Sequence, residues 1–540
     1  MLNDKLTQES IIELIDKLKS ITSNNGFAGT PEESKIITQV FLFKFLHDKF
    51  FFKLKAILKI YDNHELLSYL NKLSENEYSK IMMQLDADTA IFKKNHFIEN
   101  LFSKQNSPNF AEEFDKIFNQ LSELNQVFTI DNSSGEKEPL FESLGKDLKD
   151  NKNGFFKAII NALINSNFEA LFNGSYDFYS QIFEYLIKDY NNHSGGAYAE
   201  YYTPQSASKI ISSILVPEGT KDVTCYDPSA GSGTLLMTLA DEIGSHKCST
   251  YAQEISEKST KLLKLNLVLN GLVHSLTNVV RGNTILSPSH VEDNGQLQKF
   301  DYIVSNPPFK MDFSDYRDDL VSQNDSRFFA GVPNIPKTDK KSMSIYSLFL
   351  QHIIFLMKEK NGKAAIVVPM GFLTQKKGIE RKIREEMINR NIVSGVVCMP
   401  NGIFATTGTA VAVIFLANDN HQDPILINAS ELGDEEIIDK NQRTIVNKED
   451  QEKIIETFLS RVELRNFSII AELEDIKNKE YSLSPGQYFP LIIDQEKISK
   501  GEFEEKIQHY DKLLNQLVID EKKAASILNQ KIKDIKLSED

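Results

Sequence analysis

The sequence predicts an α/β protein in which a doubly wound, parallel sheet of seven strands lies between an all-helical N-terminal domain and a C-terminal helical or coiled-coil tail. In the middle of the chain, short β-branched runs alternate with longer helical patterns, which is typical of parallel strands joined by helices. At 540 residues the chain is also too long for a single core. We therefore expect three domains, at residues 1–175, 176–434 and 435–540.

The first third of the chain is expected to be helical. Between Phe51 and Ile130 there is no glycine and only one proline, and apolar residues such as Leu54 and Ile57 recur at helical spacing. The segment Asp131 to Lys137 has the composition of a loop, after which the helical pattern resumes.

Seven runs are expected to form the sheet. They are Val223–Asp227, Ser249–Glu254, Asn278–Gly282, Tyr302–Ser305, Ala364–Val368, Gly395–Met399 and Ala410–Leu416. Ligands of doubly wound sheets bind beyond the carboxyl ends of the strands, so a site is expected among the residues that follow these runs.

The C-terminal tail carries a heptad pattern. Eight of its ten a and d positions are apolar, and the ten are Phe503, Ile507, Tyr510, Leu514, Leu517, Glu521, Ala524, Leu528, Lys531 and Ile535. The pattern fits a helix that pairs with a partner helix, and it fits equally an amphipathic helix packed on its own domain.

Composition favours a soluble, cytoplasmic protein that handles neither a membrane nor a metal. No run of about 18 uncharged apolar residues occurs, and the first ten residues lack the apolar core of a signal peptide. The three cysteines and ten histidines show no metal-ligand spacing. Because a net charge of −15 repels phosphates at long range, we expect a partner to help in any role on nucleic acid.

A glycine turn follows the first expected strand and opens the next helix, where a cofactor-binding turn belongs. Its residues are Asp227, Pro228, Ser229, Ala230, Gly231, Ser232, Gly233 and Thr234. The leading acid would repel a pyrophosphate but attract a cationic amino group. S-adenosylmethionine has such a group and no phosphate, so it is the expected cofactor.

Two further strand ends fit the same ligand. Glu254 ends the second expected strand, where an acid is placed to accept hydrogen bonds from both ribose hydroxyls. Asn283 follows the third, where its amide is placed to contact the adenine ring. A glycine turn alone matches many unrelated loops, whereas the ordered series of strand ends is much more specific.

The fourth strand is followed by Asn306, Pro307, Pro308 and Phe309. These residues suit methylation of an adenine amino group, whose lone pair is delocalised into the ring. Acceptors such as the Asn306 side-chain oxygen and the Pro307 carbonyl would bind the amino hydrogens and favour a tetrahedral nitrogen. Phe309 offers a stacking face for a base that has been flipped out of the duplex.

These motifs resemble those of adenine-N6 methyltransferases, and the whole chain resembles the modification subunit of type I restriction-modification systems. DPSAGSG is similar to the first motif of amino-methyltransferases and NPPF to their catalytic motif, while EYYTP resembles an upstream motif that closes over the cofactor. Softer matches are GKAAIVVP from Gly362, NGIFATTGTAVAVIFL from Asn401 and YSLSPGQYF from Tyr481.

The resemblance implies a Rossmann-like methyltransferase sheet and further cofactor contacts. These would come from Glu200, Tyr201, Tyr202, Thr203, Pro204 and Gln205. It also implies that a separate specificity subunit reads the DNA and holds two modification subunits, and that a restriction subunit cuts. Asn283 and Phe309 depart from the aspartate and tyrosine that many relatives have at these positions.

Three alternatives stay open at this point. Methyltransferases that act on protein glutamine or on RNA also use an NPP motif, although they are usually smaller. A non-catalytic scaffold would keep the cofactor pocket for shape alone. The basic stretch from Phe372 to Arg390 fits either a contact with DNA phosphates or a solvated helix face.

Overall fold

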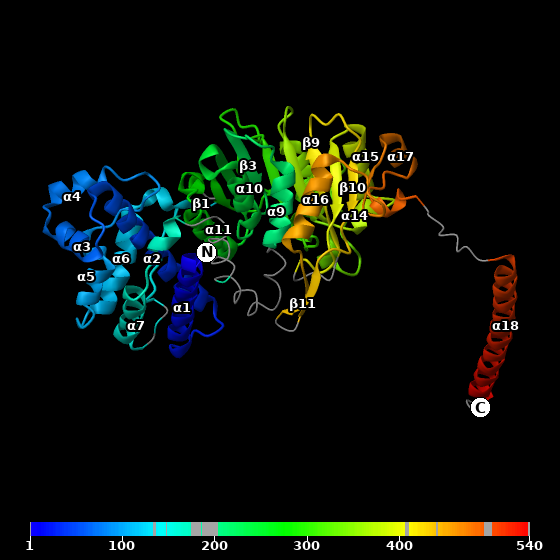
Figure 1. Ribbon diagram of the computed structural model, residues 1–540, viewed down its shortest axis with the longest axis horizontal. Helices are drawn as coiled ribbons and strands as arrows, with labels where there is room; N and C mark the ends of the chain where they lie inside the picture. Colours follow the sequence, from blue (N-terminus) through cyan, green and yellow to red (C-terminus); the bar gives the residue numbers. More distant parts are fainter. Residues whose placement is uncertain are drawn as a thin grey trace. The chain divides into compact units, whose positions relative to one another are not determined.

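The computed structural model describes residues 2–132, 137–146, 148, 150–173, 185, 203–404, 410–438, 441–490 and 499–537. The chain forms two compact units, Met1–Phe489 and Pro490–Asp540 (Figure 1). The first unit therefore continues past residue 435, where the C-terminal helical region was expected to begin.

The N-terminal part of the first unit is mainly helical, as expected. Its α-helices are α1 (Leu2–Asn24), α2 (Pro31–Leu58), α3 (Asn63–Lys72), α4 (Glu75–Met82), α5 (Ile98–Ser103), α6 (Phe110–Leu124) and α7 (Lys152–Ile164). The long helix α2 begins with Pro31 after Thr30, whose hydroxyl accepts from the Glu33 N–H at 3.3 Å. Phenylalanines gather around Phe43 of α2, with the rings of Phe92, Phe114 and Phe118 within 6.1 Å.

The rest of the unit is built around a large mixed sheet. Its strands, in chain order, are β1 (Ile130–Asn132), β2 (Lys137–Glu138), β3 (Val223–Asp227), β4 (Cys248–Glu254), β5 (Val279–Arg281), β6 (Tyr302–Ser305), β7 (Lys363–Pro369), β8 (Val393–Cys398), β9 (Val411–Ala417), β10 (Ile425–Asn428) and β13 (Ser468–Ile470). They lie in the spatial order β13-β10-β8-β9-β7-β6-β3-β4-β5-β1-β2. A separate hairpin pairs β11 (Asp434–Ile438) with β12 (Asn441–Ile445).

All seven expected strands are present within a residue or two, but the count of seven was wrong, because the described sheet has 11. β1 and β2 come from the region that was expected to be all-helical, and β10 and β13 extend the opposite edge. Each of these four strands has four residues or fewer, too short for an alternating pattern to show in the sequence. The sheet is also mixed rather than parallel, since β9 runs antiparallel to both β7 and β8.

Helices cover both faces of the sheet. On one face lie α9 (Gln205–Leu215), α10 (Thr234–Ile243), α11 (Glu257–Leu269) and α16 (Lys448–Ser460). Helices α9 and α16 are distant in the sequence but pack side by side (Figure 1). On the other lie α13 (Tyr346–Leu356), α14 (Gly371–Thr374), α15 (Ile379–Asn389) and α17 (Leu473–Asn478). Alternate residues of β7 enter the two cores, Ala365 and Val367 the first and Ile366 and Val368 the second.

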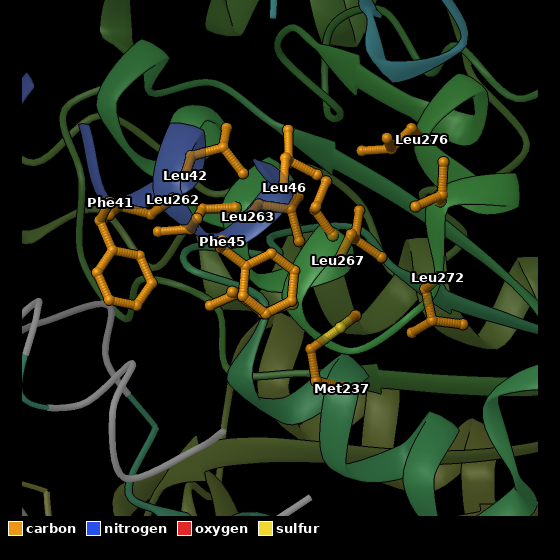
Figure 2. Close-up of a cluster of buried hydrophobic side chains, with 14 of the residues drawn as sticks. Phe41, Leu42, Phe45, Leu46, Met237, Leu262, Leu263, Leu267, Leu272 and Leu276 are labelled. Atoms are coloured by element: carbon orange, nitrogen blue, oxygen red, sulfur yellow. The ribbon is translucent and has the colours of Figure 1, made fainter. Parts of the chain in front are cut away.

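The N-terminal helices share the first of these cores with the sheet. Figure 2 shows side chains of α2 packed against those of α10, α11 and the 3₁₀ segment Val273–Asn278. Phe45 and Leu46 from α2 meet Leu263 and Leu267 from α11, and all four are at most 1% exposed. Burial of each such side chain contributes about 1.5–3 kcal/mol, so the helical part is anchored to the sheet by apolar packing.

The second unit contains α18 (Lys500–Leu537), a single helix that carries the predicted heptad positions. Its apolar side chains are about half exposed, for example Phe503 at 54%, Leu517 at 57% and Leu528 at 61%. Among the described residues of both units, every helix falls short of the combination of length and apolarity that crossing a bilayer requires.

Candidate active site

The glycine turn lies where the sequence placed it, between β3 and α10. Gly233 caps α10 with a φ of 83°, and a Cβ added to it would lie 2.3 Å from Cδ1 of Leu263 in α11. Only glycine satisfies both the backbone conformation and this close approach. The turn therefore presents bare backbone at the carboxyl end of β3, where a ligand can come close.

Glu254 ties the end of β4 to this turn. Its Oε2 accepts from the Gly231 N–H at 2.8 Å and its Oε1 accepts from the Ser256 N–H at 2.8 Å. Asp227 is bound in a similar way, since its Oδ1 accepts from the Ser229 N–H at 2.9 Å. Both carboxyl groups are thus fixed at neighbouring strand ends and keep lone pairs for a further ligand.

The two acids are buried, and their ionisation is unfavourable in the protein alone. Burial raises the pKa of Asp227 to about 8, helped by the negative charge of Glu254 and opposed by the hydrogen bond from Ser229. Burial likewise raises the pKa of Glu254. In the part of the chain that the structure describes, neither carboxylate has a lysine or arginine partner, so a cationic ligand would relieve a real electrostatic cost.

The end of β5 completes this side of the site. The Gly282 N–H donates to the Glu254 carbonyl at 2.9 Å, and the Thr284 hydroxyl donates to the Pro228 carbonyl at 2.6 Å. Asn283 follows this strand end. Its Oδ1 accepts from the N–H groups of Ile285 and Leu286, both at 3.1 Å, and its side chain forms a further hydrogen-bond contact with Tyr316.

The NPPF motif is linked to the same turn from the other side. Ser305, the last residue of β6, forms a hydrogen bond between its Oγ and that of Ser229, at 2.7 Å. The next residue, Asn306, is half-buried, and its Nδ2 donates to Oγ1 of Thr203 at 3.1 Å. The motif is therefore held beside the glycine turn, with the Asn306 oxygen unused by this contact.

Phe309 is half-buried and supported by other rings. Its ring lies 6.3 Å from that of Tyr346 in an edge-to-face arrangement, and Tyr346 in turn lies 6.1 Å from Phe372. Such aromatic contacts are worth about 0.5–1.5 kcal/mol each beyond the area they bury. They fix the plane of Phe309, as a stacking surface requires.

Part of the expected upstream contact set can be located. Thr203 is 5% exposed, Pro204 is the N-cap of α9, and Gln205 begins that helix with a buried Oε1 that has no hydrogen-bond partner in the described structure. Glu200, Tyr201 and Tyr202 lie outside the described residues. The buried Gln205 oxygen fits a ligand donor on this side of the turn.

The sequence did not indicate how the segment after NPPF is fixed. Residues 310–345 contain α12 (Ser314–Ser322) and share a small apolar core with Ile285, Leu348 and Phe349. Arg327, which is 2% exposed, donates to the carbonyls of Thr284 at 3.2 Å and Ile285 at 2.8 Å. This buried arginine pins the segment to the end of β5. An arginine within a stretch of aspartates gives no sequence signal for burial.

The basic stretch from Phe372 to Arg390 is not a simple row of exposed cations. Arg384 is fully buried and donates to the carbonyls of Phe372, Gln375 and Tyr481. Arg381 is paired with Glu385 at 2.9 Å. Arg384 therefore holds the YSLSPGQYF segment against α14 and α15. The other basic residues of the stretch, Lys376, Lys377, Lys382 and Arg390, are exposed.

A cavity of about 770 Å³ lies elsewhere, between α2, the β2 region and α11. Its charged lining is largely paired internally, as in Lys35 with Glu142 at 3.0 Å and Arg281 with Glu138 at 3.0 Å. Because these charges already satisfy one another, the cavity lacks the converging unpaired groups of the strand-end site. Among the described residues, no cluster of histidine, cysteine or acidic side chains is arranged to hold a metal ion.

Comparison with known proteins agrees with this geometry. A family model described as N-6 DNA Methylase matches residues 174–497, more than half of the 540-residue chain. The chain belongs to the N-6 DNA methylase family. It is therefore a site-specific DNA methyltransferase, and the predicted relation to type I modification subunits is confirmed by its similarity to methylase subunits of type I restriction enzymes.

Two relatives of this family illustrate the match. The MpnII methylase subunit of Mycoplasma pneumoniae is 26% identical over 394 residues, which cover 71% of this chain and 69% of the relative. The MjaVIII methylase subunit of Methanocaldococcus jannaschii is 24% identical over 523 residues, which cover 93% of this chain and 83% of the relative.

Among solved structures, the methyltransferase subunit of a type I restriction-modification system from Streptococcus thermophilus has the same fold. Its TM-score is 0.71 at 20% identity, and the match covers 90% of this chain and 100% of that one. A modification subunit from Vibrio vulnificus matches with a TM-score of 0.53 at 15% identity, covering 86% of this chain and 92% of that one. These structures support the α/β methyltransferase-like fold with helical regions before and after it.

Proposed function

We propose that this methyltransferase transfers the methyl group of S-adenosylmethionine to the N6 amino group of an adenine flipped out of DNA, as the modification subunit of a type I complex. The observation that carries the proposal is the position of Asn306 at the end of β6. Hydrogen bonds join it to Thr203 and join Ser305 to Ser229, beside two buried acids that have no cationic partner among the residues the structure describes.

The described residues fit S-adenosylmethionine as cofactor. Asp227 and the unpaired Gln205 oxygen would accept from the ammonium end, Glu254 would accept from the ribose hydroxyls, and the Asn283 Nδ2 would donate to the adenine ring. The turn from Pro228 to Thr234 would provide the backbone surface between them, with Glu200, Tyr201 and Tyr202 as further contacts. When bound, the cofactor would supply a methyl group on a cationic sulfur. Transfer to the amino nitrogen would break the carbon–sulfur bond, leave a neutral thioether and release one amino proton, without a covalent enzyme intermediate.

The chain's own residues would prepare the amino nitrogen. The Asn306 oxygen and the Pro307 carbonyl would accept its two hydrogens, localising the lone pair on nitrogen as the transition state forms. Pro307 and Pro308 provide no N–H donors and restrict the backbone, so these acceptors stay oriented. Phe309, supported by Tyr346, would stack on the flipped base and offset part of the cost of unstacking, a few kcal/mol.

Type I relatives also suggest how the protein works in the cell. We propose a cytoplasmic complex in which a specificity subunit binds two copies of this chain and selects the DNA site, while a restriction subunit cuts. Delegated recognition fits the net charge of −15, because an acidic protein has little affinity for phosphates by itself. Residues 176–434 would hold the methyltransferase domain, and the C-terminal region from residue 435, α18 above all, would contact the partner.

The test is methyl transfer from radiolabelled S-adenosylmethionine to genomic DNA, with and without the specificity subunit, followed by nucleoside analysis. N6-methyladenine that depends on the partner supports the proposal, whereas labelled protein or RNA would replace it with the alternative substrates. Asn306→Ala should abolish transfer while cofactor affinity changes less than about threefold, since Asn306 is assigned to the target base. A scaffold would give no transfer with either protein.

A further inference from the structure

Thr203 makes a contact that its expected role as a cofactor ligand does not explain. Its Oγ1 accepts a hydrogen bond from Nδ2 of Asn306 at 3.1 Å. Thr203 is 5% exposed, and the contact joins residues that are far apart in the chain. The threonine thus holds the side chain whose oxygen the proposed reaction needs.

The orientation of this amide decides whether the site can work. An asparagine side chain has a donor end and an acceptor end, and rotation by half a turn exchanges them. With Nδ2 directed at Thr203, Oδ1 faces away and is free to accept from the target amino group. In the opposite orientation the Asn306 NH₂ would oppose the NH₂ of adenine, leaving two donors without acceptors, at a cost typical of unsatisfied polar groups.

Both ends of the hydrogen bond rest on rigid supports. Thr203 directly precedes Pro204, the N-cap of α9, and this helix buries Ala207, Ile210 and Ile211 completely. On the other side, the hydrogen bond between Ser305 and Ser229 fixes the backbone that enters Asn306. A contact between two such fixed points holds the amide more tightly than rotamer preference alone.

We propose that Thr203 is a positioning residue for methyl transfer, whose hydroxyl holds the Asn306 side chain at the place where its oxygen meets the target amino group. The inference rests on the proposed function and goes beyond it, because it gives Thr203, a residue of the upstream segment, an effect on the rate of methyl transfer itself. Loss of the hydroxyl should then slow the reaction even when cofactor is saturating.

The experiment compares Thr203→Val with Thr203→Ser in the chain assembled with its specificity subunit. Valine keeps the branched shape and removes the hydroxyl, while serine keeps the hydroxyl. We expect Thr203→Val to lower kcat by about 10- to 100-fold, as small misplacements of catalytic groups do, with a change of less than about threefold in the Kd for S-adenosylmethionine. Thr203→Ser should recover kcat to within about threefold of the wild type.

Two controls sharpen this comparison. Ser212→Ala removes a fully buried hydroxyl from the same helix, one that has no partner in the described structure, and should leave kcat unchanged. Thermal unfolding of each variant identifies any that fold poorly.

The outcomes separate this inference from the function on which it rests. A wild-type complex without any transfer would overturn both. If the wild-type complex is active, three results would overturn the positioning role alone. These are a Thr203→Val variant with a normal kcat, one that loses only cofactor affinity, and one that is no slower than Thr203→Ser.

Discussion

Asp227→Asn should have opposite effects on stability and on cofactor binding. Asp227 is 2% exposed, and burial raises its pKa from the ordinary 3.8 to about 8. At about 1.4 kcal/mol for each pKa unit, ionisation of this carboxyl costs the folded protein about 6 kcal/mol. Asparagine removes the charge and keeps an oxygen for the Ser229 N–H, although its amide also has a burial cost. A net gain of about 1–3 kcal/mol at pH 8 is expected.

The pH dependence has a definite sign. Between about pH 4 and pH 8 the folded protein retains a proton on Asp227 that the unfolded chain has released, so the contribution of this group to stability falls as pH rises. The stabilisation by Asp227→Asn should therefore be larger at pH 8 than at pH 6. Urea unfolding of the protein without cofactor, followed by circular dichroism at both pH values, measures it.

Cofactor binding should change in the other direction. If the Asp227 carboxylate accepts from the ammonium group, the variant loses a charge-assisted hydrogen bond and about 1–3 kcal/mol of binding free energy, measured by calorimetry. A variant that is both less stable at pH 8 and unchanged in cofactor affinity would refute the reasoning on both counts.

Asp301 provides the matched control at the start of β6. Burial raises its pKa, but hydrogen bonds from Lys358 and Thr224 outweigh this and hold the pKa below its ordinary value. Its ionised form therefore stabilises the fold above the unfolded pKa, and this contribution is lost as pH falls. Asp301→Asn should destabilise the protein at pH 8 without affecting cofactor binding.

Three further predictions follow from the same structure. Gly233→Ala should lower the free energy of unfolding in urea by at least about 2 kcal/mol, because the added Cβ would overlap Leu263. The control Gly219→Ala, at a φ of 81° with open space around it, should cost only about 1 kcal/mol, and equal losses would contradict the close-packing argument. Leu517→Asp in α18 should abolish co-purification with the specificity subunit and leave cofactor affinity intact, and retained association would remove α18 from the proposed interface. The isolated chain should bind DNA weakly and without sequence preference, with the shallow salt dependence of few phosphate contacts, so tight specific binding in a filter assay would exclude delegated recognition.

The central strands and the motifs between them were predictable because they are local patterns. β3, β4 and β6 lie within a residue of their predicted ranges, and the glycine turn directly follows β3. Runs of β-branched residues bounded by turn residues specify such strands without reference to the rest of the chain. The edge strands β2 and β13, and β1 next to β2, are short and have no such pattern, since they form where a neighbouring strand offers unpaired backbone groups.

The contacts that make a site out of these motifs were decided by the tertiary structure. The sequence placed Thr203 and Asn306 in separate motifs, and only the tertiary structure brings the residue before Pro204 to the end of β6, where a hydrogen bond joins the two side chains. Burial likewise gives Asp227 its raised pKa and turns Arg384 from an expected surface cation into a buried anchor. Residue types and spacing determine which chemistry is available. Exposure and long-range contacts, which depend on the whole fold, determine which groups meet and in what state of charge.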